Sequence, residues 1–408
     1  MADCVAAQIT RERTVERGTH EKQDRAWRRW NEYIRSIGIK EDLFLENFTR
    51  EHKHIIIGAF AMAVREARFS RASHERLAAG TVKDTVQYVC ATFRENGYPN
   101  PSIDDDGLPA FILQREFRSF KNTDPEEKHQ KAIPISVISE LIHRDGTDLE
   151  RAIGELATIG IFFAMRSCEY LQVAKPDQWR TEILRLRNIR FFRGVEQLSH
   201  NHRELEFADC VALTFERQKK DEKMDTVTLM ASQDARLCPV RAAAAIVRRI
   251  TKYPGSSQDS PISTVTVNGH LKQVTSTHMI NALRDAVGAI GEVKLGVKKE
   301  DVGTHSIRSG AAMAMYLGEC PVFMIMLIGR WSSDAFLRYI RKQVMEFSQN
   351  VAKRMLSCQN FRHIPDIHMR VQQDNPRIRN HPDNSETRRN VGGDSHRRVR
   401  LPPFSKFS

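Results

Sequence analysis

Apolar residues recur at helical spacing through the first third of the chain. Trp27, Trp30, Tyr33 and Ile34 lie three and four residues apart with charged residues among them, which is the pattern of an amphipathic helix. The same periodicity predicts three more helices, over residues 55–64, 81–93 and about 108–121. We therefore expect a helical domain over residues 21–121, after a polar and poorly ordered N-terminus of residues 1–20.

A polar and charged stretch, residues 122–131, is broken by Pro125 and has the composition of a linker. The helical pattern resumes beyond it, over residues 134–142, 148–164, 239–249, about 276–289, and 306 to about 355. Three short runs of β-branched and aromatic residues, 189–192, 211–215 and 226–229, are separated by polar turns and predict a small antiparallel sheet. The chain is therefore expected to be mainly α with a small antiparallel β-sheet (α+β), and to have a second domain over residues 132–358.

The chain is strongly basic. Its 408 residues include 63 Lys and Arg against 51 Asp and Glu, a net charge of +12, and such an excess is typical of proteins that bind nucleic acid. Residues 361–408 hold ten of these basic residues and five of the acidic ones, so the basic character is not confined to the C-terminus. Residues 359–408 contain few apolar residues and are predicted to form a disordered basic tail. The tail either attracts DNA non-specifically, or carries a nuclear import signal in Arg397-Arg-Val-Arg400, or is a solvated segment without a role.

Several classes of protein do not fit this sequence. No run approaches the roughly 20 apolar residues of a membrane span, and the N-terminus has no apolar signal core. The seven cysteines are scattered without a CxxC pair, which indicates the reduced thiols of an intracellular protein and no zinc site. The acidic run Asp104–Asp106 precedes Gly107, which indicates a solvated loop. We therefore expect no membrane association, no metal and no cofactor.

Three segments place cationic side chains where they could hold an anion. Arg166 ends the apolar run Ile161–Met165 and is followed three residues later by Glu169, so its guanidinium needs either that carboxylate or a phosphate as partner. His305 and Arg308 stand three residues apart at a predicted helix start, where free N–H groups and the helix dipole already favour an anion. The small residues that follow Arg308 would let this helix pack closely on its neighbour: Gly310, Ala311, Ala312 and Ala314.

The third segment is Gly329-Arg-Trp-Ser-Ser-Asp-Ala-Phe-Leu-Arg-Tyr339. Tyr339 lies 31 residues after Arg308 and is flanked by basic residues. A helical tyrosine is usually a packing residue, but one with basic neighbours near the end of the ordered region is better placed to face DNA.

Together these segments resemble the catalytic domain of the tyrosine recombinases, which include the integrases and the Cre-like and Xer-like enzymes. The shared pattern is Arg with Glu three residues on, then HxxR, then a glycine turn and a Tyr nine residues after Arg330. The sequence of the last segment, GRWSSDAFLRYI, looks most like that of the eukaryotic Crypton and DIRS-type transposon recombinases. The resemblance covers residues 132–358, and the helical region fits the family's core-binding domain only by position and pattern.

The resemblance implies a role for each matching residue. Arg166 and Arg308 would hold the scissile phosphate, Tyr339 would be the nucleophile, and His305 would orient or deprotonate it. A lysine in a hairpin turn should protonate the departing 5′-oxygen. Gln218-Lys219-Lys220-Asp221 lies between two strand-like runs, so Lys219 is the candidate and Lys220 the alternative.

One position departs from the family pattern. Many members have His or Trp directly after the glycine, whereas this chain has Arg330 and then Trp331. Either side chain can donate to a phosphate oxygen, so the sixth position stays open between them.

These residues imply a metal- and ATP-independent enzyme that breaks and rejoins double-stranded DNA through a 3′-phosphotyrosine, for integration or excision of a mobile element. Four protomers would assemble in a synapse, with residues 344–355 docked on a neighbour or packed on their own domain, in the nucleus. Two alternatives share the fold: a type IB topoisomerase or telomere resolvase, and a host-adopted DNA-binding protein without catalysis. DNA relaxation with no recombinant product would favour the topoisomerase.

Overall fold

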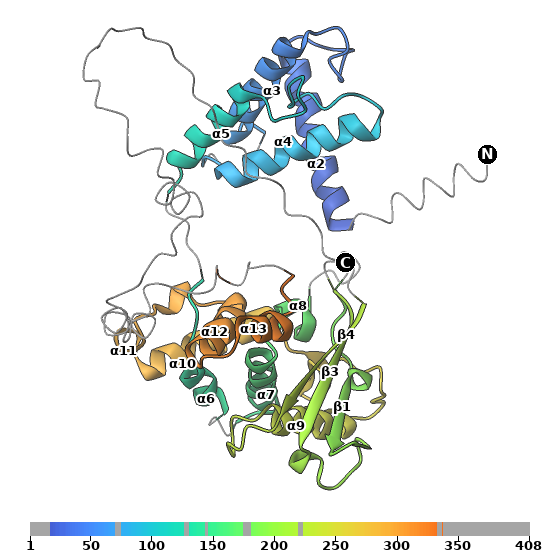
Figure 1. Cartoon of the computed structure of the whole chain (residues 1–408), viewed down its shortest axis with the longest axis vertical. Coiled ribbons are helices and arrows are strands. Elements are labelled where there is room, and N and C mark those ends of the chain that lie inside the picture. The colour runs from blue at the N-terminus through green and yellow to red at the C-terminus, as the bar shows by residue number, and fades with distance from the viewer. Residues whose placement is uncertain are drawn as a thin grey trace, which may run out of the picture. The chain divides into compact units, whose positions relative to one another are not determined.

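The computed structural model describes residues 17–69, 75–125, 130–142, 146–173, 181–218, 223–332 and 337. In the N-terminal part of these residues the chain forms helices, as the apolar periodicity predicts (Figure 1). They are α2 (Arg17–Ser36), α3 (Arg50–Arg65), α4 (Ala79–Glu95) and α5 (Phe111–Asn122).

The core of this helical region is aromatic. Trp30 is fully buried, stands edge-to-face against Phe60 at a ring-centroid separation of 5.1 Å, and donates its indole N–H to the Leu43 carbonyl at 2.9 Å. Arg65 pairs with Asp124, whose other carboxylate oxygen accepts the Ala79 N–H at 2.8 Å. The end of α3 and the residues after α5 therefore both tie down the start of α4.

The second region, from residue 130 onward, is built around one buried helix. This is α7 (Asp148–Phe162), which begins with a capping box between Thr147 and Glu150 and is buried from Ala152 almost without a break. Its neighbours include the helices α6 (Ile135–Ile142), α9 (Pro239–Thr251), α10 (Ser276–Ile290) and α12 (Thr304–Leu317). Because the C-terminal half of α7 is buried, the residues that follow it begin in the middle of the core.

A four-stranded antiparallel sheet lies beside these helices (Figure 1). Its spatial order is β2 (Glu196–Leu198), β1 (Ile189–Arg193), β3 (Cys210–Arg217) and β4 (Lys223–Met230). In the register, Leu213 pairs with Ile189 on one side and with Val227 on the other. The mainly α architecture with a small antiparallel sheet is confirmed, and α9 covers the sheet through contacts with β3 and β4.

A second, two-stranded hairpin lies outside the three strands predicted from the sequence. It consists of β5 (Thr264–Val267) and β6 (His270–Gln273), joined by Asn268-Gly269. Both turn residues have positive φ, 52° and 74°, which is the backbone of the two-residue turn that Asn-Gly favours.

The helical pattern predicted from Ser306 onward is not one continuous helix. Helix α12 ends at Leu317, and a separate helix, α13 (Val322–Gly329), begins after Pro321. Glu319 has a φ of 57°, and proline cannot donate the next helical hydrogen bond, so the chain changes direction there. Two short helices complete this part, α8 (Ser167–Tyr170) and α11 (Glu292–Leu295), with 3-10 turns at Leu186–Asn188, Leu205–Phe207 and Lys299–Asp301. Among the described residues, no helix is long and apolar enough to cross a membrane.

Candidate active site

The site begins where α7 ends. The helix closes through a hydrogen bond of 2.9 Å from the Met165 N–H to the Gly160 carbonyl, with Ala164 at a φ of 45°. Arg166 then takes an extended backbone conformation and serves as N-cap of α8. Arg166 therefore stands in a turn between two helices, rather than on the end of the helix that the sequence predicts. We call residues Phe163–Arg166 the arginine turn.

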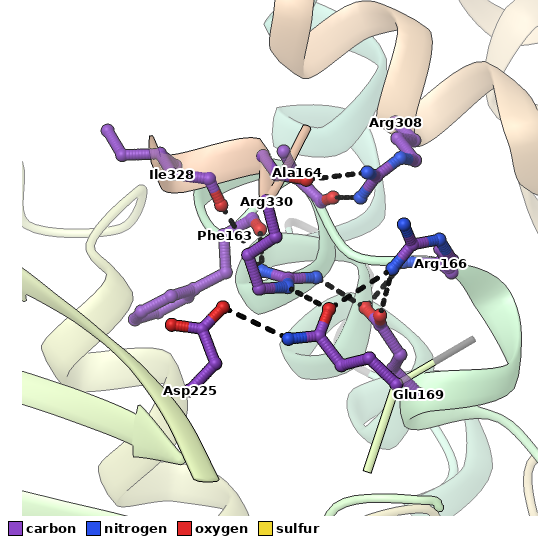
Figure 2. Close-up of polar contacts among 10 residues, drawn as sticks. Phe163, Ala164, Arg166, Glu169, Asp225, Arg308, Ile328 and Arg330 are labelled. Carbon is purple, nitrogen blue, oxygen red and sulfur yellow. Dashed lines mark hydrogen bonds and ion pairs between the residues drawn. The ribbon is translucent and has the colours of Figure 1, made fainter. Parts of the chain in front are cut away.

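Arg308 and Arg330 both bind the arginine turn, to which Arg166 itself belongs (Figure 2). Arg308 donates to the Ala164 carbonyl and, at 2.6 Å, to the Gly329 carbonyl. Arg330 donates to the Phe163 carbonyl at 3.1 Å. Residues far apart in the sequence are thus fixed to one four-residue segment, and this brings Arg166 and Arg308 to the same place.

Glu169 is the carboxylate at the centre of this cluster. It is fully buried and accepts from the Arg166 N–H at 2.7 Å, the Arg166 guanidinium at 3.0 Å and the Arg330 guanidinium at 2.6 Å (Figure 2). A buried carboxylate needs such charge-assisted partners. The sequence analysis noted Glu169 only as a neighbour of Arg166, whereas the structure has it bridging two arginines.

Gln218 ties the sheet to the cluster. Its amide oxygen accepts from Arg330 Nε at 3.2 Å and from Arg166 at 3.4 Å, and its amide nitrogen donates to Asp225 at 3.0 Å. Gln218 directly follows β3, and the pairing of Arg217 with Lys223 closes the β3–β4 hairpin around residues 218–222. Lys219 and Lys220 lie outside the described residues, but the hairpin that contains them is the one predicted, and its first residue contacts the arginines.

His305 and Arg308 stand on the first turns of α12, as the sequence predicts for a helix start. His305 is exposed, whereas the Arg308 residue is only 2% exposed. The His305 backbone N–H donates to the side-chain oxygen of Gln130 at 2.9 Å. Gln130 falls in the stretch assigned to the linker, and sequence reasoning gave it no part in the site.

The close packing expected from the small residues of α12 is confirmed at Gly310. A Cβ built on this residue would overlap the carbonyl oxygen of Ile133 and lie 3.3 Å from its C and N atoms. The Ile133 N–H also donates to the Ser306 carbonyl at 3.4 Å. The helix that holds His305 and Arg308 therefore lies directly against the backbone of Ile133.

Arg330 and Trp331 differ in what they contact. Arg330 caps α13 in the left-handed conformation, with φ 53° and ψ 48°, and its side chain is 1% exposed. Trp331 packs its ring where a Cβ of Gly329 would stand, and the Arg308 guanidinium lies over that ring, 4.5 Å from its centroid. Among these contacts Arg330 faces Glu169, while Trp331 faces Arg308.

Burial shapes the protonation of the groups around the cluster. It lowers the pKa of Arg330, an effect that the charge of Glu169 opposes. It also raises the pKa of the Cys168 thiol to about 11, with the Glu169 charge adding to the shift, so this cysteine is a neutral thiol at physiological pH. Burial raises the pKa of Tyr170 as well, which removes this tyrosine as a source of phenolate.

Tyr339 and residues 344–355 lie outside the described residues, as do most of the N-terminus (1–16) and the whole basic tail (359–408). Across the described part of the chain, no group of three or more His, Cys, Asp or Glu side chains is arranged to hold a metal ion.

No protein-family model matches the chain, and no curated protein matches it. The solved structures to which it is similar include recombinases and integrases. The XerH site-specific recombinase bound to difH substrate is 13% identical with a TM-score of 0.42, over 81% of this chain and 76% of that one. The Tn1549 transposon integrase in complex with transposon right end DNA is 12% identical with a TM-score of 0.47, over 86% of this chain and 98% of that one. A lambda integrase dimer bound to a COC′ core site is 12% identical with a TM-score of 0.36, over 86% of this chain and 80% of that one.

Proposed function

We propose that this chain is a site-specific DNA recombinase that cleaves and rejoins DNA strands through a covalent 3′-phosphotyrosine at Tyr339. The observation that carries the proposal is the arginine turn, where Arg166 and Arg330 pair with the buried Glu169 and Arg308 is held on the Ala164 carbonyl. An excess of fixed positive charge is what stabilises the additional negative charge of a pentavalent phosphate.

In this mechanism Arg166 and Arg308 bind the non-bridging oxygens of the scissile phosphate. Arg166 is suited to this, because its side chain is 26% exposed while one edge is anchored on Glu169. Arg308 commits two of its donors to main-chain carbonyls, which fixes the plane of its guanidinium. Loss of one such donor commonly costs about 10²–10³ in rate.

The proton transfers are assigned to His305 and to a lysine of the β3–β4 turn. The Tyr339 oxygen forms a bond to phosphorus and its proton passes toward His305, while the bond from phosphorus to the 5′-oxygen breaks and the lysine supplies the proton that this oxygen needs. Lys219 remains the candidate and Lys220 the alternative. The contact of Gln218 with Arg166 supports this assignment, since it anchors the first residue of the turn at the cluster. A 5′-hydroxyl of another strand then reverses the step, and because the phosphotyrosine conserves the bond energy, ATP is not needed.

The chain length after α13 is compatible with Tyr339 as nucleophile. Tyr339 is the seventh residue after Ser332, and an extended chain of seven residues spans at most about 25 Å. This length allows Tyr339 to reach the cluster that Gly329, Arg330 and Trp331 help to build.

The wider role follows from the same chemistry and the basic chain. We propose double-stranded DNA as substrate, a tetrameric synapse, and integration or excision of a mobile element related to the Crypton and DIRS-type transposons. A nuclear location is proposed from the Arg-rich tail.

The test uses a pool of randomised nicked duplexes, from which the 5′-hydroxyl fragment diffuses away after cleavage and leaves an SDS-resistant adduct. Wild type is compared with Tyr339→Phe and with Tyr170→Phe as the matched control. Tyr170 suits this purpose, because its hydroxyl is buried and has no hydrogen-bond partner among the described residues. We expect adduct from wild type and Tyr170→Phe and none from Tyr339→Phe. DNA binding by wild type without any adduct would support the non-catalytic DNA-binding alternative.

A further inference from the structure

The Arg330 side chain is buried, and each contact that the structure describes for it is with protein. Its Nε donates to Gln218 at 3.2 Å, one terminal nitrogen donates to the carbonyls of Phe163 at 3.1 Å and Ile328 at 3.2 Å, and the other donates to Glu169 at 2.6 Å. These bonds engage four of the five N–H donors of a guanidinium. The Phe215 ring lies 3.7 Å from the guanidinium carbon, and the side chain is only 1% exposed. At most one N–H of this group is therefore left for a DNA phosphate.

The backbone at Arg330 is consistent with a role for the side chain inside the protein. Its left-handed conformation, at a φ of 53°, favours glycine at a helix C-terminus. An arginine at such a position is retained at a conformational cost, which its side-chain contacts must offset. Those contacts lead to Glu169 and Gln218.

Glu169 and Gln218 both also accept hydrogen bonds from Arg166. Glu169 accepts from the Arg166 backbone N–H and from its guanidinium, at 2.7 Å and 3.0 Å. Gln218 accepts from the same guanidinium at 3.4 Å. Because Glu169 is fully buried, its charge needs the charge of Arg330 as well as that of the partly exposed Arg166. Arg330 thus holds the two acceptors that fix one edge of Arg166, as Figure 2 shows.

We infer that Arg330 is a positioning residue that holds Arg166 through Glu169 and Gln218, and that it is not itself a ligand of the scissile phosphate. The inference rests on the proposed function, since it assigns the phosphate to Arg166. It resolves one of the two candidates for the sixth position, because Arg330 takes the place where many family members have His or Trp but turns its donors inward.

The experiment is a double-mutant cycle on the rate of adduct formation, measured in single turnover and divided by the folded fraction from circular dichroism. The variants are Arg330→Met, Glu169→Gln and the two combined. Arg330→Met alone leaves the buried Glu169 charge with Arg166 but without Arg330, and should slow cleavage by about 10²–10³-fold, the cost of losing one phosphate donor. In the combined variant no buried carboxylate is left without its Arg330 partner, so its rate should be no lower than that of Arg330→Met. An independent phosphate ligand would instead give losses that multiply.

A second arm separates positioning from general damage to the fold. In an Arg166→Ala background, Arg330→Met should slow cleavage by less than about 3-fold, because the residue it positions is already gone. The matched control is the buried ion pair between Arg249 of α9 and Glu155 of α7, at 2.8 Å, for which the described residues show no hydrogen bond or ion pair to Arg166. Arg249→Met with Glu155→Gln should lower the folded fraction and leave the rate per folded molecule unchanged.

The possible failures are distinguishable. If wild type forms no adduct, the proposed function fails. If wild type is active but Arg330→Met slows the Arg166→Ala protein by a further 10²-fold or more, or the cycle is multiplicative, Arg330 binds the phosphate and the inference is overturned.

Discussion

The packing of α12 on Ile133 can be tested with a single methyl group. Gly310→Ala adds a Cβ that overlaps the Ile133 carbonyl oxygen. This oxygen belongs to the backbone, so it cannot rotate away, and α12 and the segment around Ile133 must separate by roughly 1 Å to restore ordinary contact. Alanine in a helix is favoured over glycine by about 1 kcal/mol, whereas overpacking of this kind costs about 1–3 kcal/mol.

We therefore expect Gly310→Ala to lower the free energy of unfolding by up to about 2 kcal/mol, the overpacking cost less the gain from alanine. The matched control is Gly288→Ala in α10, where the added Cβ meets nothing within 4 Å. That variant should be more stable than wild type by about 0.5–1 kcal/mol. Both values come from urea denaturation followed by circular dichroism.

Activity should fall further than stability, because α12 holds both His305 and Arg308. A displacement of about 1 Å in a catalytic group can cost about 10²-fold in rate, so adduct formation by Gly310→Ala should drop by that order while Gly288→Ala stays at the wild-type rate. If Gly310→Ala were as stable and as active as wild type, α12 would not lie against Ile133 as described.

Two further predictions concern charge and ring contacts. Hydrogen bonds from Arg187 and then Asn188 lower the pKa of Glu216 to about 2, so its ionised form stabilises the fold above the unfolded-state pKa near 4.5, and this stability disappears as the pH falls toward 2. Because Arg187 is 40% exposed, solvent screening reduces the expected effect. Glu216→Gln should lower the free energy of unfolding by about 1–2 kcal/mol at pH 7 and match wild type near pH 2, as measured by urea denaturation. An equal difference at both pH values would argue against this role of Glu216. Trp331→Ala removes the ring beneath Arg308 and should cost about 3–5 kcal/mol of stability, whereas Trp331→Phe should keep most of the stability and the adduct rate. Equal losses for the two variants would mean that the ring does not support Arg308.

The sequence predicted the helices well because their cores are periodic and long. The apolar positions in the run that begins at Asp148 and the spacing of Trp27, Trp30 and Tyr33 each indicate a buried helix face. Spacings of three and four residues predict a helix at both places. The hairpin that contains Lys219 could also be predicted, since β-branched runs border a polar turn. The Asn268-Gly269 hairpin had an equally good signal that was overlooked.

The contacts that organise the candidate site could not be derived from the sequence. Gln218 and Arg330 are 112 residues apart, and nothing local to either indicates the other. Whether a side chain faces DNA or the protein interior depends on tertiary packing, which is why the sixth position stayed open between Arg330 and Trp331. The helix break before Pro321 was visible in the sequence, but the apolar pattern continues on both sides of it and hid the change of direction.

The central claim, covalent catalysis by Tyr339, is tested most directly by locating the DNA on the protein. The wild-type adduct would be trapped on a nicked duplex, digested with nuclease and protease, and its peptides analysed by mass spectrometry. We predict a nucleotide 3′-phosphate on the peptide that contains Tyr339 and on no other. A nucleotide attached to any other residue, or an adduct that persists in Tyr339→Phe, would contradict the account.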